Sequence, residues 1–204
     1  MNRAGPIFTL LAVVLLGGGL LLTNFTGGVD SSSAPTATTT AAPIAPATTT
    51  APATTTAPAA FPKQADYVTT IENASPPLTL SFTVTGAKAV AYVCDGVTVE
   101  SWLRGPAENG RMNLTGNNSH LEATLEGRDL RGTLTLGERR YDFTAPPVQP
   151  PAGLYVARGP NGRDSWIVDS DGTVTGVRRN PDGTTTPAPQ LAPDAQKVRG
   201  NDDF

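Results

Sequence analysis

The feature that most constrains the fold is a series of short runs in which apolar and polar residues alternate. Residues 78–85 read Leu-Thr-Leu-Ser-Phe-Thr-Val-Thr, and the run ends at Gly86. A period of two is typical of a strand with one buried face, so we expect a half-buried strand here. The same rhythm continues to Phe143, and no window of ten residues has a convincing helical period. Glycines punctuate the runs at Gly116, Gly127, Gly132 and Gly137.

Short strands at this regular spacing predict an all-β fold, an antiparallel meander that closes as a small barrel or sandwich. Asp95-Gly96 separates two β-prone runs. Because Asp-Gly suits the positive φ angles of a two-residue type I′ turn, we expect a hairpin there. A turn that tight places Tyr92 opposite Val99 across the two strands.

Three further short strands are predicted at residues 153–158, 165–169 and 173–178. They follow the proline-rich segment 146–151, which is either a boundary or an edge connection. Three strands are few for an independent core, so we expect them to pack onto the meander in one domain of residues 63–180. Residues 181–204 are polar and proline-rich, and we expect a mobile tail.

The amino-terminal segment is apolar enough to enter a membrane. No charged residue lies between Arg3 and Asp30, and residues 7–25 are just long enough to cross a hydrocarbon core about 30 Å thick. No clean Ala-x-Ala cleavage site follows, so we favour an uncleaved signal-anchor in residues 1–30 over a cleaved signal peptide. By the positive-inside rule the remaining chain lies outside the cytoplasmic membrane, and it is secreted if the segment is cleaved.

Residues 31–62 contain neither charge nor glycine and consist of Ser, Thr, Ala, Pro, Ile and Phe. Repeated prolines disfavour helix and favour extended polyproline II geometry. At about 3.1 Å per residue such a segment reaches on the order of 100 Å when stretched. We expect a disordered spacer, either unmodified or O-glycosylated, that holds the domain away from the membrane.

The net charge and the cysteine content bear on which kinds of ligand and covalent cross-link the protein can have. A net charge of -3 and a pI near 5.1 give no indication of nucleic-acid binding. Cys94 is the only cysteine in the chain, so an intrachain disulfide is excluded and so is a zinc site built from several thiolates. Because Cys94 follows an apolar run, we expect a buried, inert thiol.

Four runs in the folded part carry a resemblance to known proteins. Residues 89–96, 99–105, 152–155 and 166–168 resemble a family of unknown function, composed of secreted or membrane-anchored β-domain proteins of actinobacteria. The resemblance covers roughly residues 66–178. It implies an extracytoplasmic β domain and carries no established activity.

Three residues are the candidate ligand contacts. Trp102 and Trp166 are either core residues, which we favour, or platforms for a sugar. Arg104 belongs to a set of arginines that would hold an anion if they gathered on one face, although interleaved glutamates favour a mixed solvated surface. The other members of this set are Arg111, Arg128, Arg131, Arg139 and Arg140.

Motifs for catalysis or metal binding are weak. His120 lies beside Ser119 without a Gly-x-Ser-x-Gly motif, so we interpret it as a loop residue. Residues 169–172, Asp-Ser-Asp-Gly, begin like a calcium loop, but Asn180 stands where the twelfth-position glutamate belongs. A hairpin turn is the simpler interpretation, and we name no catalytic residue, metal ligand or cofactor.

These observations favour a non-catalytic binding or structural domain of the bacterial cell envelope, anchored in the membrane and facing outwards. Its expected partner is a cell-wall glycan or an envelope protein. One alternative is a carbohydrate-active enzyme with an Asp/Glu pair, which requires a pocket that holds both carboxylates. The other is an accessory or sensor component that works with a membrane partner.

Overall fold

The computed structural model describes residues 59–203, and the regular secondary structure in this range is entirely β-strand. The predicted anchor, and nearly all of the predicted spacer, lie outside the described residues. Within residues 59–203, no helix is long and apolar enough to cross a membrane.

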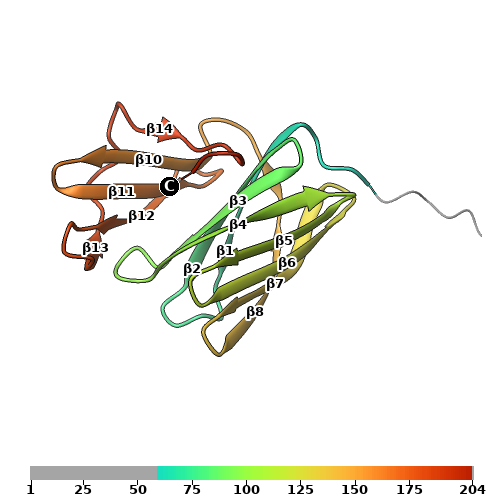
Figure 1. Cartoon of the computed structure of the whole chain (residues 1–204), viewed down its shortest axis with the longest axis horizontal. Helices are drawn as coiled ribbons and strands as arrows, with labels where there is room; N and C mark the ends of the chain where they lie inside the picture. The colour runs from blue at the N-terminus through green and yellow to red at the C-terminus, as the bar shows by residue number, and fades with distance from the viewer. Residues whose placement is uncertain (1–58, 204) are drawn as a thin grey trace, which may run out of the picture. The chain divides into compact units, whose positions relative to one another are not determined.

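The larger sheet is an antiparallel meander that nearly closes on itself (Figure 1). Its order is β8-β7-β6-β5-β4-β3-β2-β1-β9. The Thr69 hydroxyl of β1 donates to the Thr144 carbonyl of β8 at 2.9 Å, which joins the two ends of the meander. The predicted all-β fold is therefore confirmed, and of the two expected arrangements, barrel or sandwich, this sheet resembles the barrel. The strands are β1 Gln64–Ile71, β2 Leu78–Thr85, β3 Lys88–Cys94, β4 Glu100–Glu108, β5 Arg111–Gly116, β6 Ser119–Glu126, β7 Asp129–Leu136, β8 Arg139–Ala145 and β9 Pro147–Val148.

Apolar side chains fill the interior of this sheet. Phe82 of β2 stacks on Phe143 of β8 with ring centroids 5.1 Å apart. Leucines from successive strands surround them, including Leu103, Leu114 and Leu121, all fully buried. The interior is therefore a packed core, which the alternating sequence pattern supplies from every strand.

A second sheet of five strands follows, in the order β13-β12-β11-β10-β14. The proline-rich segment that precedes it contributes β9, which pairs with the edge of β1 and so acts as an edge connection. Two of the strands lie beyond the three that the sequence predicts. The strands are β10 Gly153–Gly159, β11 Gly162–Val168, β12 Val174–Arg179, β13 Thr185–Pro187 and β14 Gln196–Lys197.

The second sheet packs on the outer face of β1–β3 and forms a second core. Val90 and Tyr92 of β3 are buried there together with Leu154 and Ile167 of the smaller sheet. The prediction that residues 78–85 form a half-buried strand is wrong in this respect, because β2 is buried on both faces. Its outward residues are small hydroxyl side chains, such as the fully buried Ser81, which allow the second sheet to approach closely.

The hairpin at Asp95-Gly96 exists, but its turn is longer than predicted. One carboxylate oxygen of Asp95 accepts the backbone N–H groups of Val97, Thr98 and Val99, each at 2.8 Å. This side chain satisfies the backbone of a loop that spans residues 95–99. Tyr92 consequently lies opposite Trp102 and not opposite Val99.

Residues 196–203 form a segment that we call the C-terminal strap, where the sequence suggested a mobile tail from residue 181. Val198 is buried in the second core, and its N–H donates to the Leu154 carbonyl at 2.9 Å. The Gly200 N–H donates to the Thr85 hydroxyl at 3.0 Å. The strap thus links both sheets, which a polar composition does not reveal.

Gly200 provides a test of the strap. A Cβ at this position would lie 2.6–2.7 Å from backbone atoms of Thr83, Thr85 and Lys88. We expect Gly200→Ala to reduce the free energy of unfolding by about 1–3 kcal/mol, because paired strands cannot easily move aside. Urea denaturation measures the change. Gly159→Ala is the control, since no atom lies within 4 Å of its added Cβ. Equal stabilities of the two variants would contradict the packing of the strap.

Cys94 is buried in the second core, as predicted, and burial raises its pKa from 9.0 to about 12. The folded state therefore keeps a proton that the unfolded chain releases above pH 9. We expect this contribution to stability to be complete below pH 9 and to be lost as the pH rises towards 12. Comparison of denaturation midpoints with those of Cys94→Ala isolates the effect. In the native protein at pH 8, the thiol should react with a disulfide reagent only after unfolding.

Candidate functional site

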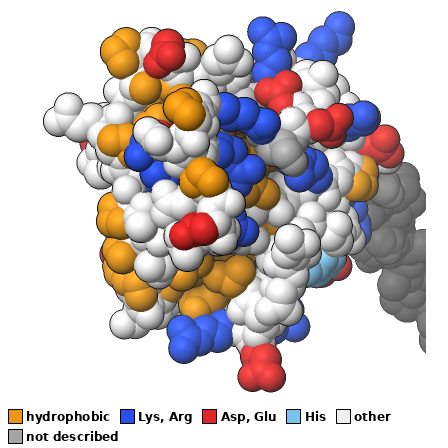
Figure 2. Space-filling view, turned by 60° about the vertical axis from the view of Figure 1, so that its left-hand side comes forward, with side chains coloured by type: hydrophobic (Ala, Val, Ile, Leu, Met, Phe, Trp, Pro, Cys, Tyr) orange, Lys and Arg blue, Asp and Glu red, His pale blue; other side chains and the backbone are white. Residues whose placement is uncertain are grey.

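A groove lies where the outer face of β4 meets the end of the second sheet. Trp102 and Arg104 lie on this face of β4, and Arg163 and Arg179 come from β11 and β12. We call this cavity, of about 600 Å³, the arginine groove. Figure 2 shows Lys and Arg side chains gathered around a hollow on one face of the molecule. The residues that line the groove are Glu100, Ser101, Trp102, Arg104, Thr115, Gly116, Asn117, Arg163 and Arg179.

Strand register brings the two arginines of the second sheet together. Arg163 and Arg179 are cross-strand partners in β11 and β12, and Arg158 of β10 is the partner of Arg163 on the other side. Cross-strand partners share a face of a sheet. In β12, Arg179 is two residues from the buried Val177, so this is the face that packs on the larger sheet. The arginines therefore stand at the margin of the second core.

Gly162 allows the hairpin that sets part of this register. Its φ is +114°, and an added Cβ would collide with the carbonyl oxygen of Arg179. A side chain at position 162 would therefore push β11 away from β12. The spacing between Arg163 and Arg179 depends on this glycine.

Glu100 is a buried carboxylate that contacts several side chains of the groove. Its side chain is 3% exposed, and one carboxylate oxygen accepts from Arg163 Nη2 at 3.0 Å and from Trp102 Nε1 at 3.1 Å. The other oxygen lies 3.6 Å from Nε of Arg179. The Ser165 hydroxyl adds a longer contact at 3.4 Å. One buried carboxylate thus orients two guanidinium groups and the indole.

Trp102 is half-buried in a stack of side chains. Its ring lies beside that of Tyr92, with centroids 4.6 Å apart, and the guanidinium of Arg163 lies over it at 4.9 Å. This distance is that of a cation–π contact. A ligand that approaches this face of the indole therefore meets a positive charge, which suits an anion better than a neutral sugar ring.

Burial of Tyr92 affects its own ionisation. Burial raises its pKa well above 10.0, and the neighbouring Cys94 and Glu100 act in the same direction. The Ser165 side chain lies close enough to the Tyr92 hydroxyl to oppose this rise in part. The phenol therefore stays neutral beneath the groove, and the charge there comes from the arginines and Glu100.

Arginines outnumber carboxylates among the residues that line the groove. Arg104, Arg163 and Arg179 line it, against the single carboxylate of Glu100. Guanidinium groups bind carboxylate and phosphate oxygens with paired, charge-assisted hydrogen bonds. The arrangement is therefore chemically suited to bind an anion.

The structure separates the three predicted ligand contacts. Trp102 and Arg104 both line the arginine groove. Trp166 is 1% exposed, and its indole N–H donates to the Pro189 carbonyl at 2.8 Å. Trp166 is therefore a core residue, which was the favoured interpretation.

The other arginines considered with Arg104 do not line this groove. They are distributed over β5, β7, β8 and the turn between β6 and β7. Arg131 pairs with Glu126 at 3.3 Å, and both side chains are largely exposed. These arginines therefore belong to the mixed solvated surface that the interleaved glutamates suggested. Arg104 instead lies with Arg163 and Arg179, which are distant from it in sequence.

His120 lies on β6, where the sequence suggested a loop. It is paired with Glu122 at 3.4 Å, while the adjacent Ser119 hydroxyl contacts Ser101 in the interior. The two side chains point to opposite faces of the strand. They are therefore not arranged as a nucleophile and base.

Residues 169–172 form the predicted hairpin turn. The Asp169 N–H donates to the Thr173 carbonyl at 2.9 Å, and Asp171 accepts the Thr173 N–H at 2.8 Å. Hydrogen bonds with Thr173 lower the pKa of Asp171. In the part of the chain that the structure describes, no group of three or more His, Cys, Asp or Glu side chains is placed to hold a metal ion.

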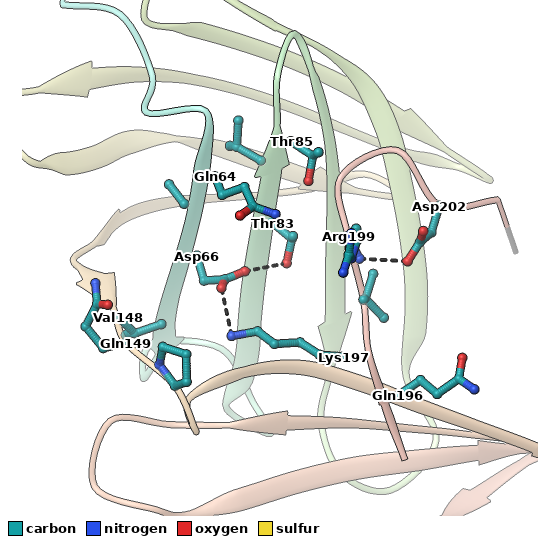
Figure 3. Close-up of a pocket in the computed structure, with 14 residues that line it drawn as sticks. Gln64, Asp66, Thr83, Thr85, Val148, Gln149, Gln196, Lys197, Arg199 and Asp202 are labelled. Carbon is teal, nitrogen blue, oxygen red and sulfur yellow. Dashed lines mark hydrogen bonds and ion pairs between the residues drawn. The ribbon is translucent and has the colours of Figure 1, made fainter. Parts of the chain in front are cut away.

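A larger cavity, of about 730 Å³, lies between β1, β2 and the C-terminal strap (Figure 3). It contains the carboxylates of Asp66 and Asp202. Asp66 is bound by Lys197 at 2.8 Å and by the Thr83 hydroxyl at 2.9 Å, and Asp202 accepts the Arg199 N–H at 2.7 Å. Both carboxylates thus anchor or shape the strap.

Sequence reasoning missed Glu100, Arg163 and Arg179. The signal that would have found the arginines is the pair of turns at residues 160–162 and 169–172. Once both hairpins are in register, Arg158, Arg163 and Arg179 fall side by side. The approach of β4 to these strands comes from packing between sheets, and no local pattern encodes it.

Comparison with known proteins yields no relative. No protein-family model matches the chain, and no curated protein or solved structure is significantly similar to it. The interpretation of the groove therefore depends on its geometry and chemistry.

Glu100→Gln tests the organising role of the buried carboxylate. We expect the free energy of unfolding to fall by about 3 kcal/mol. This value is at the lower end of the range for breaking a buried ion pair, because Arg163 and Arg179 are partly exposed. Glu126→Gln is the matched control, since its exposed pair with Arg131 contributes less than about 1 kcal/mol. Chemical denaturation compares the two, and similar losses would show that Glu100 does not organise the groove.

Proposed function

We propose that the β domain is a non-catalytic binding domain whose ligand is an anion held in the arginine groove. The observation that carries the proposal is that Arg104, Arg163 and Arg179 line one groove, where Glu100 contacts the last two. The contact of Arg163 with the Trp102 ring supports an anion over a neutral carbohydrate. Glu100 presets the orientation of two of the arginines, which lowers the entropic cost of binding.

We also propose where this binding takes place. Residues 7–25 would anchor the chain in the cytoplasmic membrane, or direct its secretion if they are removed, and residues 31–62 would act as a spacer. The domain would then face the cell envelope of an actinobacterium, as the sequence resemblance implies. An anionic envelope component, either a cell-wall glycan or the acidic surface of an envelope protein, is the corresponding partner.

The structure offers less support for a carbohydrate-active enzyme. Such an enzyme needs two carboxylates placed about a substrate, one of them able to donate a proton. Glu100 of the arginine groove is already bound by two arginines, and the carboxylates of the larger cavity hold the strap. The packed interior of the larger sheet leaves the outer surface as the place for a ligand.

Thermal unfolding of the full chain in detergent tests anion binding. Galacturonate oligomers and tripolyphosphate should raise the melting temperature, whereas a neutral maltose oligomer should not. At a hundredfold excess over the dissociation constant, a ligand of the folded state adds about 2.7 kcal/mol to stability. Equal shifts with neutral and acidic oligomers would contradict the proposal.

Two substitutions locate the site. Arg163→Gln should weaken anion binding about tenfold or more, because each charge-assisted hydrogen bond contributes roughly 1.5–3 kcal/mol. Arg139→Gln makes the same change of charge on an exposed part of β8 and should leave affinity nearly unchanged. Titration calorimetry measures both, and equal losses would show that binding depends only on net charge.

A further inference from the structure

Three arginines form a ladder across the second sheet. Arg158, Arg163 and Arg179 occupy directly opposed positions on β10, β11 and β12. Neighbouring strands lie about 4.8 Å apart, so the three side chains leave the sheet at this interval and on one face. We call these residues the arginine ladder.

The register places three like charges side by side in the ladder. Like charges directly opposite each other on adjacent strands destabilise a sheet. Glu100 contacts Arg163 and Arg179, so one carboxylate lies against two of the positive charges. The opposite face of the same strands is arranged differently, because Arg178 and Asp164 there form a paired contact with both distances 2.6 Å. The groove face of these strands therefore carries a row of arginines, whereas the opposite face pairs an arginine with an aspartate.

The ladder continues into the arginine groove. Arg163 and Arg179 belong to both, and Arg104 adds a positive charge from β4. Arg158 extends the row outwards to an exposed position on β10. Positive charge therefore runs across the strands over a distance longer than one small anion would need, in line with the gathered Lys and Arg side chains of Figure 2.

We propose that the ligand is a linear polyanion, an acidic polysaccharide, that crosses the strands with successive acidic groups on successive arginines. This inference rests on the proposed function and specifies its ligand class. Several modest contacts along a chain add in affinity once the first is made. Release of counterions from such a chain also makes binding depend steeply on salt.

A polysaccharide fits this surface better than a single-stranded nucleic acid does. Proteins that bind single strands combine a basic groove with aromatic rings on which bases stack. In the arginine groove, the guanidinium of Arg163 lies over the ring of Trp102, and Trp166 is buried elsewhere. The acidic chain, of net charge -3, also lacks the general attraction for nucleic acid.

The test is a length series with the full chain in detergent. Galacturonate monomer, dimer, tetramer and hexamer are titrated by calorimetry at two salt concentrations. Affinity should rise at least tenfold from monomer to tetramer and then level off, and the hexamer should lose more affinity in high salt than the monomer does. Polyphosphate and a single-stranded DNA oligomer of matched charge form the comparison arms.

Arg158→Gln separates the ladder from the rest of the groove. It should weaken tetramer binding about tenfold and leave monomer binding unchanged, whereas Arg163→Gln should weaken both. Arg139→Gln, on β8, is the control and should change neither. Unfolding midpoints of the variants show whether each remains folded.

The outcomes distinguish the two proposals. If monomer and hexamer bind with equal molar affinity and both depend on Arg163, the polyanion inference is overturned while anion binding stands. If none of the anions binds to the folded chain, the proposed function itself fails. Preferential binding of polyphosphate or of DNA would overturn the choice of an acidic polysaccharide.

Discussion

Burial of the outer face of β1–β3 under the second sheet is the interaction on which the rest of the structure depends. Val68, Val90 and Tyr92 on that face pack against Leu154, Ile167 and Val177. Without this contact the larger sheet would expose an apolar outer surface, and the short strands of the smaller sheet would lack a core. The same contact brings β11 and β12 up to β4, so the groove is a consequence of how the two sheets meet.

The margin of this second core is polar, and the site lies there. Glu100 is nearly inaccessible to solvent and is bound by Arg163, Arg179 and the indole of Trp102. A buried carboxylate requires such partners, because an unpaired charge in an apolar interior is strongly unfavourable. The partners that satisfy it also line the groove. The proposed ligand-binding role thus falls on arginines that also have a structural role.

Local pattern predicted the strands well because alternation records which face of each strand is buried. Prediction from local pattern was less successful where a side chain reshaped a turn or where the second sheet buried polar residues. The Asp95 carboxylate satisfies three backbone amides and lengthens a turn that composition suggested would have two residues. Ser81 is polar by composition yet is fully buried on the face that the second sheet covers, and Thr83 is buried beside the C-terminal strap. Val198 anchors a strap within a polar segment.

The candidate site also contains some residues that the sequence could identify and others that it could not. Trp102 and Arg104 could be named from the sequence because residue type alone suggests ligand contact. Their relation to Arg163 and Arg179 could not, since these residues are about sixty to seventy-five positions apart in the chain. By itself, the sequence determined the all-β class, the burial of Cys94 and most strand positions, all of which depend on neighbouring residues. Only the tertiary structure decided which arginines lie together and which tryptophan lines the groove, because both depend on two sheets that meet face to face.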